Sequence, residues 1–158
     1  DSAGAGDLVL SGGVYLGGEG AANKLDDYES GTYVPTWANI TVGNATVNTA
    51  TYVKVGDMVT VSAQLTFGST TSVDGSSPNC SLPFASVGRR FYGVGNILDN
   101  GTQNYFARSS VVEDGAVCYI SVNNASSTYS TTANITPTLP MSWVTGDNIR
   151  FSITYQAI

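Results

Sequence analysis

The stretch Thr51–Phe67, TYVKVGDMVTVSAQLTF, indicates the fold class of this chain. In its second half, Met58–Phe67, every second residue from Val59 onward is apolar and the residues between them are polar. Such a period of two is typical of a β-strand that buries one face. The pair Gly56-Asp57 separates the two halves, and a two-residue turn with glycine is typical of a β-hairpin. The stretch therefore predicts two antiparallel strands joined by a tight turn.

The same pattern of short strands and turn signals continues along the chain from Gly31. Turns or loops are expected over Leu25–Thr32, Gly68–Asn79 and Asn123–Pro140. Strands are expected over Thr32–Asn39 (irregular or at an edge because of Pro35), Ala45–Val55, Cys80–Phe84, Phe91–Leu98, Asn104–Val112, Ala116–Val122, Met141–Val144 and Asn148–Ala157. In the last strand Ile149, Phe151, Ile153 and Tyr155 share one face. Eight or nine strands without a helix predict an all-β, antiparallel β-sandwich of jelly-roll type, with a closed barrel as the alternative.

The first 24 residues, DSAGAGDLVLSGGVYLGGEGAANK, differ from the rest of the chain because glycine interrupts two short apolar runs, Leu8–Leu10 and Val14–Leu16. Strands of three residues do not bury themselves in a monomer, but they can do so when several copies of a chain wind together. We therefore divide the chain into a Gly-rich oligomerisation stem, residues 1–24, and a β-sandwich head domain, residues 25–158. The alternative for the first part is a flexible tail or linker.

Charge and composition exclude several functions. Only 11% of the 158 residues are charged, the formal net charge is −6, and the six Lys and Arg residues form no basic patch. We therefore expect no nucleic-acid and no membrane partner. Histidine is absent, which excludes a Ser-His-Asp triad and a His-ligated zinc site. We expect no cofactor and no enzymatic activity, and an active site split between subunits is the enzymatic alternative.

The acidic residues and the cysteines have structural explanations. Most aspartates stand beside Gly or Asn, where a carboxylate hydrogen-bonds the backbone of a turn. Asp26, Asp27 and Glu29 are the one cluster, and we interpret it as a turn rather than a metal site, so no metal is expected. Cys80 and Cys118 lie in apolar strand patterns and are interpreted as buried free thiols, with a single disulfide as the alternative.

Four motifs in order resemble the C-terminal head domains of bacteriophage tail-fibre and tail-spike proteins. They are NKLDDYESGTYVP at Asn23–Pro35, the Y-x-K-x-G-x-x-V-x-V hairpin from Tyr52 to Val61, SLPF at Ser81–Phe84, and G-D-x-I-R-F-S-x-x-Y from Gly146 to Tyr155. Residues Leu98–Pro140 match no motif of this group. The resemblance implies a homotrimeric, non-enzymatic virion protein that adheres to a host cell-surface glycan and attaches to other virion proteins through its N-terminal side. The alternatives are a purely structural virion or capsid decoration domain and a stand-alone carbohydrate-binding module.

Candidate glycan-binding residues are chosen by composition. Sugars bind to aromatic faces and to hydrogen-bonding amides and guanidinium groups. The segment NGTQNYFAR, residues 100–108, carries this mixture, and a second segment, residues 123–129, resembles it. The ligand-binding candidates are Asn100, Gln103, Asn104, Tyr105, Arg108, Asn124 and Tyr129.

Overall fold

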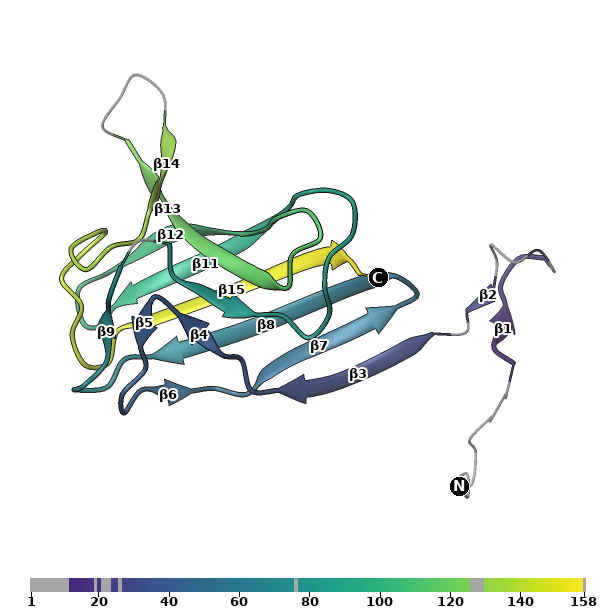
Figure 1. Cartoon of the computed structure of the whole chain (residues 1–158), viewed down its shortest axis with the longest axis horizontal. Helices are drawn as coiled ribbons and strands as arrows, with labels where there is room; N and C mark the ends of the chain where they lie inside the picture. Colours follow the sequence, from purple (N-terminus) through teal and green to yellow (C-terminus); the bar gives the residue numbers. More distant parts are fainter. Residues whose placement is uncertain are drawn as a thin grey trace.

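The computed structural model describes residues 12–18, 20, 24–25, 27–75, 77–125 and 130–157, and every regular element among them is a β-strand (Figure 1). None of the described elements is a helix that could cross a membrane. The strands are β1 (Val14–Tyr15), β2 (Lys24–Leu25), β3 (Tyr28–Tyr33), β4 (Trp37–Ala38), β5 (Ile40–Thr41), β6 (Thr46–Val47), β7 (Ala50–Val55), β8 (Met58–Thr66), β9 (Ser72–Val73), β10 (Asn79–Ser81), β11 (Phe91–Asp99), β12 (Gln103–Val111), β13 (Val117–Asn124), β14 (Thr131–Asn134) and β15 (Asn148–Gln156).

Eleven of these strands form one sheet in the order β3-β7-β8-β15-β11-β12-β13-β10-β4, with β6 pairing with β8 and β14 pairing with β13. All pairings are antiparallel. Two further pairs, β1-β2 and β5-β9, stand outside this sheet. The expectation of an all-β, antiparallel fold is therefore confirmed.

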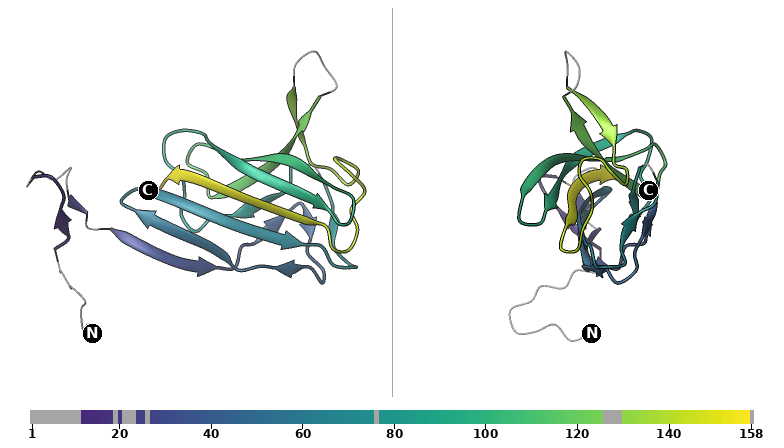
Figure 2. Two further views of the ribbon diagram at one scale, coloured as in Figure 1. Left: turned by 180° about the vertical axis from the view of Figure 1, so that it is seen from behind. Right: turned by 90° about the vertical axis from the view of Figure 1, so that its left-hand side faces the viewer.

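The sheet is curled, because its two edge strands are almost adjacent in sequence. β3 and β4 lie at opposite ends of the sheet order, yet the chain passes from Tyr33 to Trp37 in four steps, at most about 14 Å. Tyr33 Oη donates a hydrogen bond of 3.1 Å to the carbonyl oxygen of Ser81 in β10, which joins the two ends. Pro35, which lacks an N–H group, lies between the edge strands. Figure 2 shows the resulting curled cross-section in its right-hand view.

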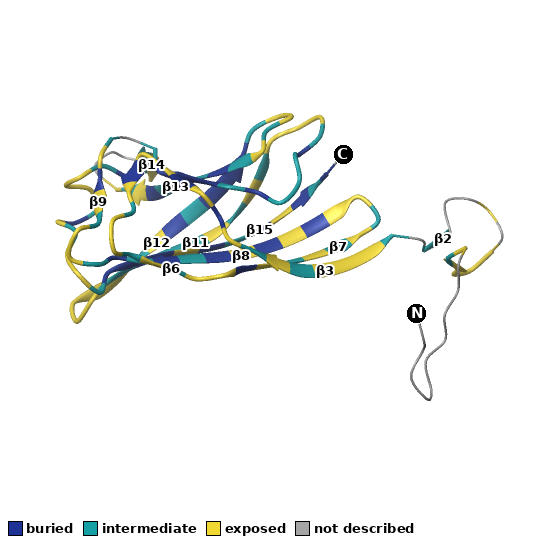
Figure 3. Cartoon of the chain, turned by 60° about the horizontal axis from the view of Figure 1, so that its bottom comes forward, coloured by how far each residue is buried: buried dark blue, intermediate teal, exposed yellow. Residues whose placement is uncertain are grey.

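The core lies inside the curl. Along β8 buried and exposed residues alternate, as the sequence predicts (Figure 3). The neighbouring strand β15 pairs Ile153 with Val61 and Ile149 with Leu65, so both strands send apolar side chains inward. Its four predicted inward residues are all buried: Ile149, Phe151, Ile153 and Tyr155. Trp37 of edge strand β4 packs edge-on against Phe151, with ring centroids 6.5 Å apart, so opposed parts of one curled sheet enclose the core.

Buried polar groups of the core have specific partners. Tyr155 is fully buried, and its hydroxyl donates a hydrogen bond of 2.9 Å to the carbonyl oxygen of Phe84. Burial raises the pKa of Tyr155 to about 12. Cys80 and Cys118 are directly opposite each other on β10 and β13, and both are buried free thiols, as expected.

A segment in the first half of the chain differs from the sequence-based expectation. The interval Leu25–Thr32, expected as a turn, contains most of β3, which pairs with β7 from Tyr28–Val55 to Tyr33–Ala50. Gly31 weakens the local strand pattern, but its missing side chain leaves room for the ring of Tyr52. A Cβ at this position would lie 2.8 Å from Tyr52 Oη, because the Tyr52 ring covers the glycine.

The second half of the chain also shows differences. β13 extends to Asn124 and pairs with β14, so part of the expected Asn123–Pro140 loop is a hairpin that projects from the sheet (Figure 1). The expected strand Met141–Val144 is irregular backbone. Trp143 in this segment stacks on Phe67, with centroids 4.7 Å apart, and its Nε1 donates to the carbonyl of Thr136 at 3.0 Å. Side-chain packing therefore replaces strand pairing there.

The N-terminal segment is described only in part. β1 pairs Val14 with Leu25 and Tyr15 with Lys24, so the strand pair extends across the boundary expected at residue 24. Val14, Tyr15 and Leu16 are exposed in the single chain. The other expected apolar run, Leu8–Leu10, lies outside the described residues.

Candidate functional site

A broad groove of about 730 Å³ lies on the outer face of the curled sheet, on the side of the strands opposite to the core. It crosses the central strands β8, β15 and β11 and reaches β7 and β12 at its sides. The lining residues are Asn48, Thr49, Thr51, Ser62, Ala63, Gln64, Val94, Gly95, Asn96, Phe106, Arg150, Phe151 and Ser152.

Strand register builds this groove from two rows of side chains. Residues directly opposite each other on paired antiparallel strands point to the same face of a sheet. The first row runs across four strands through Gln64, Arg150, Asn96 and Phe106. The second row runs across five strands through Thr51, Ser62, Ser152, Val94 and Arg108. Hydrogen-bonding side chains therefore stand on one surface although Thr51 and Ser152 are 101 positions apart in sequence.

The groove combines exposed apolar side chains with hydrogen-bonding side chains. The Phe106 side chain is 61% exposed and that of Val94 is 58% exposed, whereas the neighbouring positions carry amides, hydroxyls and a guanidinium group. Arg150 is held in place because its Nε donates a hydrogen bond of 2.9 Å to Asn148 Oδ1. An exposed aromatic face beside fixed donors and acceptors suits a ligand with both CH surfaces and hydroxyl groups.

A second, smaller pocket of about 250 Å³ lies on the same outer face, over β12, β13 and β14. Arg108 continues the second row of the groove into this pocket, where Ser121 and Asn134 extend the row across two more strands. The other lining residues are Ser77, Arg90, Ser110, Val112, Tyr119, Ile120 and Thr132.

The sequence-predicted binding residues do not form one patch. Asn100, Gln103 and Asn104 are exposed at the turn between β11 and β12. The backbone N–H of Asn100 donates to Asp147 Oδ1 at 2.9 Å, and Gln103 Nε2 donates to the hydroxyl of Tyr105. Tyr105 itself is half-buried and packs against the core.

The remaining predicted residues are distributed differently. Arg108 lines the second pocket, and Asn124 is half-buried at the end of β13. Tyr129 lies outside the described residues. Of the seven candidates, the structure thus places Arg108 in a lined pocket.

Sequence reasoning missed the residues that line the larger groove, among them Phe106, Arg150, Asn96 and Gln64. One signal was present, because the polar positions of each alternating strand mark its outward face. The register that joins these positions into rows depends on strand pairing between distant segments, which the alternation of a single strand does not reveal.

Three aspartates in or beside turns and bends accept hydrogen bonds within the domain. Asp147 accepts hydrogen bonds from the backbone N–H groups of Asn100 and Val144, and Asp114 accepts one from that of Gly88. Asp74 accepts from the hydroxyls of Ser72 and Thr41, and these bonds hold its pKa below the usual value. The expected bond to the backbone of the same turn is thus found at Asp147, which accepts from Val144, whereas Asp114 accepts from the backbone of a distant segment and Asp74 from hydroxyl groups.

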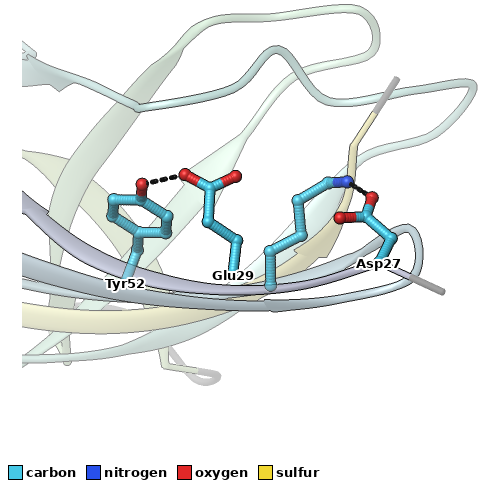
Figure 4. A network of polar contacts seen from close by, with 4 residues as sticks. Asp27, Glu29 and Tyr52 are labelled. Atoms are coloured by element: carbon cyan, nitrogen blue, oxygen red, sulfur yellow. Dashed lines mark hydrogen bonds and ion pairs between the residues drawn. The ribbon is translucent and has the colours of Figure 1, made fainter. Parts of the chain in front are cut away.

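At the β3 edge, acids of the expected cluster pair with residues of β7 (Figure 4). Asp27 forms an ion pair with Lys54, and this hydrogen bond raises the pKa of the lysine. Glu29 accepts a hydrogen bond from Tyr52, which raises the pKa of that phenol. Asp26 lies outside the described residues, and among the residues that are described no group of three His, Cys, Asp or Glu side chains is arranged to hold a metal ion.

Comparison of the chain with models of protein families, with curated proteins and with solved structures finds no significant match.

Proposed function

We propose that this chain is the head domain of a phage tail fibre or tail spike, and that it binds a host cell-surface polysaccharide without modifying it. The observation that carries this proposal is the outer groove, in which exposed Phe106 stands beside the side chains of Gln64, Asn96 and Arg150. A sugar ring would lie on the aromatic face while its hydroxyl groups bond to the amides and the guanidinium group. The four motifs that resemble tail-fibre heads support the assignment to a virion.

The proposal includes a homotrimer with a jelly-roll-like head and a stem at residues 1–24, which would also attach to other virion proteins. Val14, Tyr15 and Leu16 are exposed in the single chain, and apolar residues in a row gain stability when neighbouring copies cover them. Three equivalent sites on one particle would bind a repetitive polysaccharide with an avidity well above that of a single site.

A purely structural virion role is the second candidate, and a specific surface favours it. Val53, Val55 and Met58 are exposed on β7 and β8 and do not line the groove. A neighbouring subunit that covers these residues would use this face for assembly rather than for adhesion.

Two measurements test the proposed function. Light scattering of the full chain on a sizing column should give about three times 16.4 kDa, whereas a monomer would overturn the trimer and favour a stand-alone module. Binding to surface polysaccharides of candidate bacterial hosts should then be compared for Phe106→Ala and Tyr28→Ala. Both tyrosine and phenylalanine are exposed aromatic residues, but Tyr28 lies on β3 and does not line the groove.

The Phe106→Ala variant should bind several-fold to about tenfold more weakly, because a stacked aromatic contact contributes about 0.5–1.5 kcal/mol beyond its buried area. The Tyr28→Ala variant should bind like the wild-type protein. Equal affinities for the wild-type protein and both variants would show that the groove is not the binding site.

A further inference from the structure

The second pocket gathers positive charge on an acidic protein. The chain has 12 Asp and Glu residues but only six Lys and Arg residues. Two of the six, Arg90 and Arg108, line this pocket of about 250 Å³, and no acidic residue is among its lining residues. Arg90 immediately precedes β11 and Arg108 lies in β12. The register of this pair, Phe91 opposite Val111 and Val94 opposite Arg108, puts both arginines on the outer face of the sheet, four residues apart along the strands.

Among the described residues, neither arginine forms an ion pair with a carboxylate. Within the part of the chain that the structure describes, the ion pair is formed by Lys54 and Asp27, at the other side of the sheet. Both guanidinium groups carry a positive charge, so an anion bound in this pocket would be attracted by each of them. Guanidinium groups also remain charged at all ordinary pH values, so the pocket keeps its positive charge.

Arg108 is oriented but incompletely bonded. Its guanidinium carbon lies 4.9 Å from the centre of the Tyr92 ring, and its Nη2 donates a hydrogen bond of 3.3 Å to Thr132 Oγ1. Its Nε is buried and has no hydrogen-bond partner. A stacked, tethered guanidinium group is preorganised, because it loses little side-chain freedom when a ligand binds.

The rest of the lining can bond to a polyhydroxylated ligand. Ser110, Ser121 and Thr132 supply hydroxyl groups, and Asn134 supplies an amide. These groups both donate and accept hydrogen bonds, as sugar hydroxyls do. The pocket volume lies just below the 300–1,000 Å³ typical of sites for drug-sized ligands, which fits one saccharide unit.

We propose that this pocket binds an acidic saccharide unit, with its carboxylate or phosphate group held between Arg90 and Arg108 and its hydroxyls on the neighbouring Ser, Thr and Asn side chains. Planar guanidinium groups match the geometry of both oxyanions. The saccharide part of this proposal rests on the proposed function, whereas the preference for an oxyanion rests on the pocket alone.

The test is a titration of the full chain, followed by NMR or calorimetry at low salt, with glucuronic acid, glucose 6-phosphate and glucose as probes. The two acidic sugars should bind with a Kd of about a millimolar, and glucose should bind at least tenfold more weakly. The acidic sugar that binds more tightly identifies the preferred oxyanion. Failure of both acidic sugars to bind, or equal binding of glucose, would overturn the proposal.

Matched variants localise the effect. Arg90→Gln and Arg108→Gln should each weaken binding of the acidic sugars about tenfold or more, while Arg89→Gln should leave it unchanged. Arg89 is adjacent in sequence and carries the same charge, but it does not line the pocket and donates to Gln156 instead. An equal loss in Arg89→Gln and Arg90→Gln would mean that general charge attraction, not the pocket, is responsible. Arg90 is exposed, so its variant stays informative even if Arg108→Gln does not fold.

The two proposals fail in different ways. If acidic sugars do not bind but polysaccharide binding still depends on Phe106, the oxyanion pocket is wrong and the proposed function stands. If acidic sugars bind through Arg90 and Arg108 but no polysaccharide binds, the pocket stands and the host-adhesion proposal is wrong.

Discussion

Replacement of Asp147 by alanine should destabilise the domain more than most single changes, because this fully buried carboxylate connects separate loops. Its Oδ1 accepts a hydrogen bond of 2.9 Å from the backbone N–H of Asn100, and its Oδ2 accepts one of 2.6 Å from that of Val144. Its own backbone carbonyl accepts from the N–H of Phe67 at 2.8 Å. The side chain therefore joins the β11–β12 turn to the turn that precedes β15.

The magnitude follows from the two side-chain bonds. A hydrogen bond to a charged acceptor contributes about 1.5–3 kcal/mol. The Asn100 turn is exposed, so after the change water can hydrogen-bond to part of it and replace some of the lost interaction. The expected loss of unfolding free energy is therefore about 3–4 kcal/mol, below the largest sum of the two bonds. For a chain of this length each kcal/mol lowers Tm by about 2–4 °C, which gives a decrease of about 10 °C.

Urea unfolding, at one chain concentration for all variants, measures this effect. The Asp147→Asn variant keeps one carbonyl acceptor and should lose about half as much stability as Asp147→Ala. The Asp57→Ala variant is the control, because Asp57 is an exposed turn aspartate and its replacement should change stability by less than about 0.5 kcal/mol. A loss of less than about 1 kcal/mol in Asp147→Ala would refute the structural role given to this carboxylate.

Three further predictions concern the core. Tyr155→Phe should cost about 1–2 kcal/mol in urea unfolding, because it removes a buried hydroxyl and leaves a carbonyl oxygen without its donor; an unchanged midpoint would contradict this. Burial raises the pKa of the Cys80 and Cys118 thiols, that of Cys118 to about 12, so neither should be alkylated in the folded protein at pH 8. As the pH rises, these thiols lose their protons in the unfolded state before they do so in the folded state. The free energy of unfolding should therefore fall above about pH 9, by up to about 1.4 kcal/mol per pH unit for each thiol. Cys118→Ala should reduce that slope. Gly93→Ala should destabilise the domain by about 1–3 kcal/mol more than Gly95→Ala. A Cβ at Gly93 would lie 2.3 Å from the carbonyl oxygen of Ser152, whereas a Cβ at Gly95 would lie 3.2 Å from its nearest neighbours. Comparable thermal midpoints for the two variants would contradict the packing described for β11.

Local patterns predicted much of the fold. The alternation in Met58–Phe67 and in β15 is a property of neighbouring residues, and it correctly identified the inward faces of both strands. The Gly56-Asp57 turn was equally readable, because Gly56 has a φ of +55° that suits glycine. The buried free state of Cys80 and Cys118 followed from the apolar strands in which they lie.

Tertiary contacts overrode local patterns elsewhere. β3 forms through Gly31 and Ser30, which favour turns, because β7 supplies a complete hydrogen-bonding partner along its length. The segment Met141–Val144 has a strand-like sequence but an irregular conformation, because its Trp143 is covered by stacking on Phe67 rather than by strand pairing. Neither partner can be recognised from the residues next to these segments.

The sequence by itself determined that this chain is an antiparallel all-β protein with alternating strands, tight turns and buried thiols. These features depend on residues within a few positions of one another, where backbone preference and side-chain periodicity act directly. Only the tertiary structure decided that one sheet curls until its edge strands approach, and that Phe106 and Arg150 share a groove while Arg90 and Arg108 share a pocket. The physical reason is strand register: a shift of one residue would turn each of these side chains to the opposite face, and register is set by hydrogen bonds between distant strands.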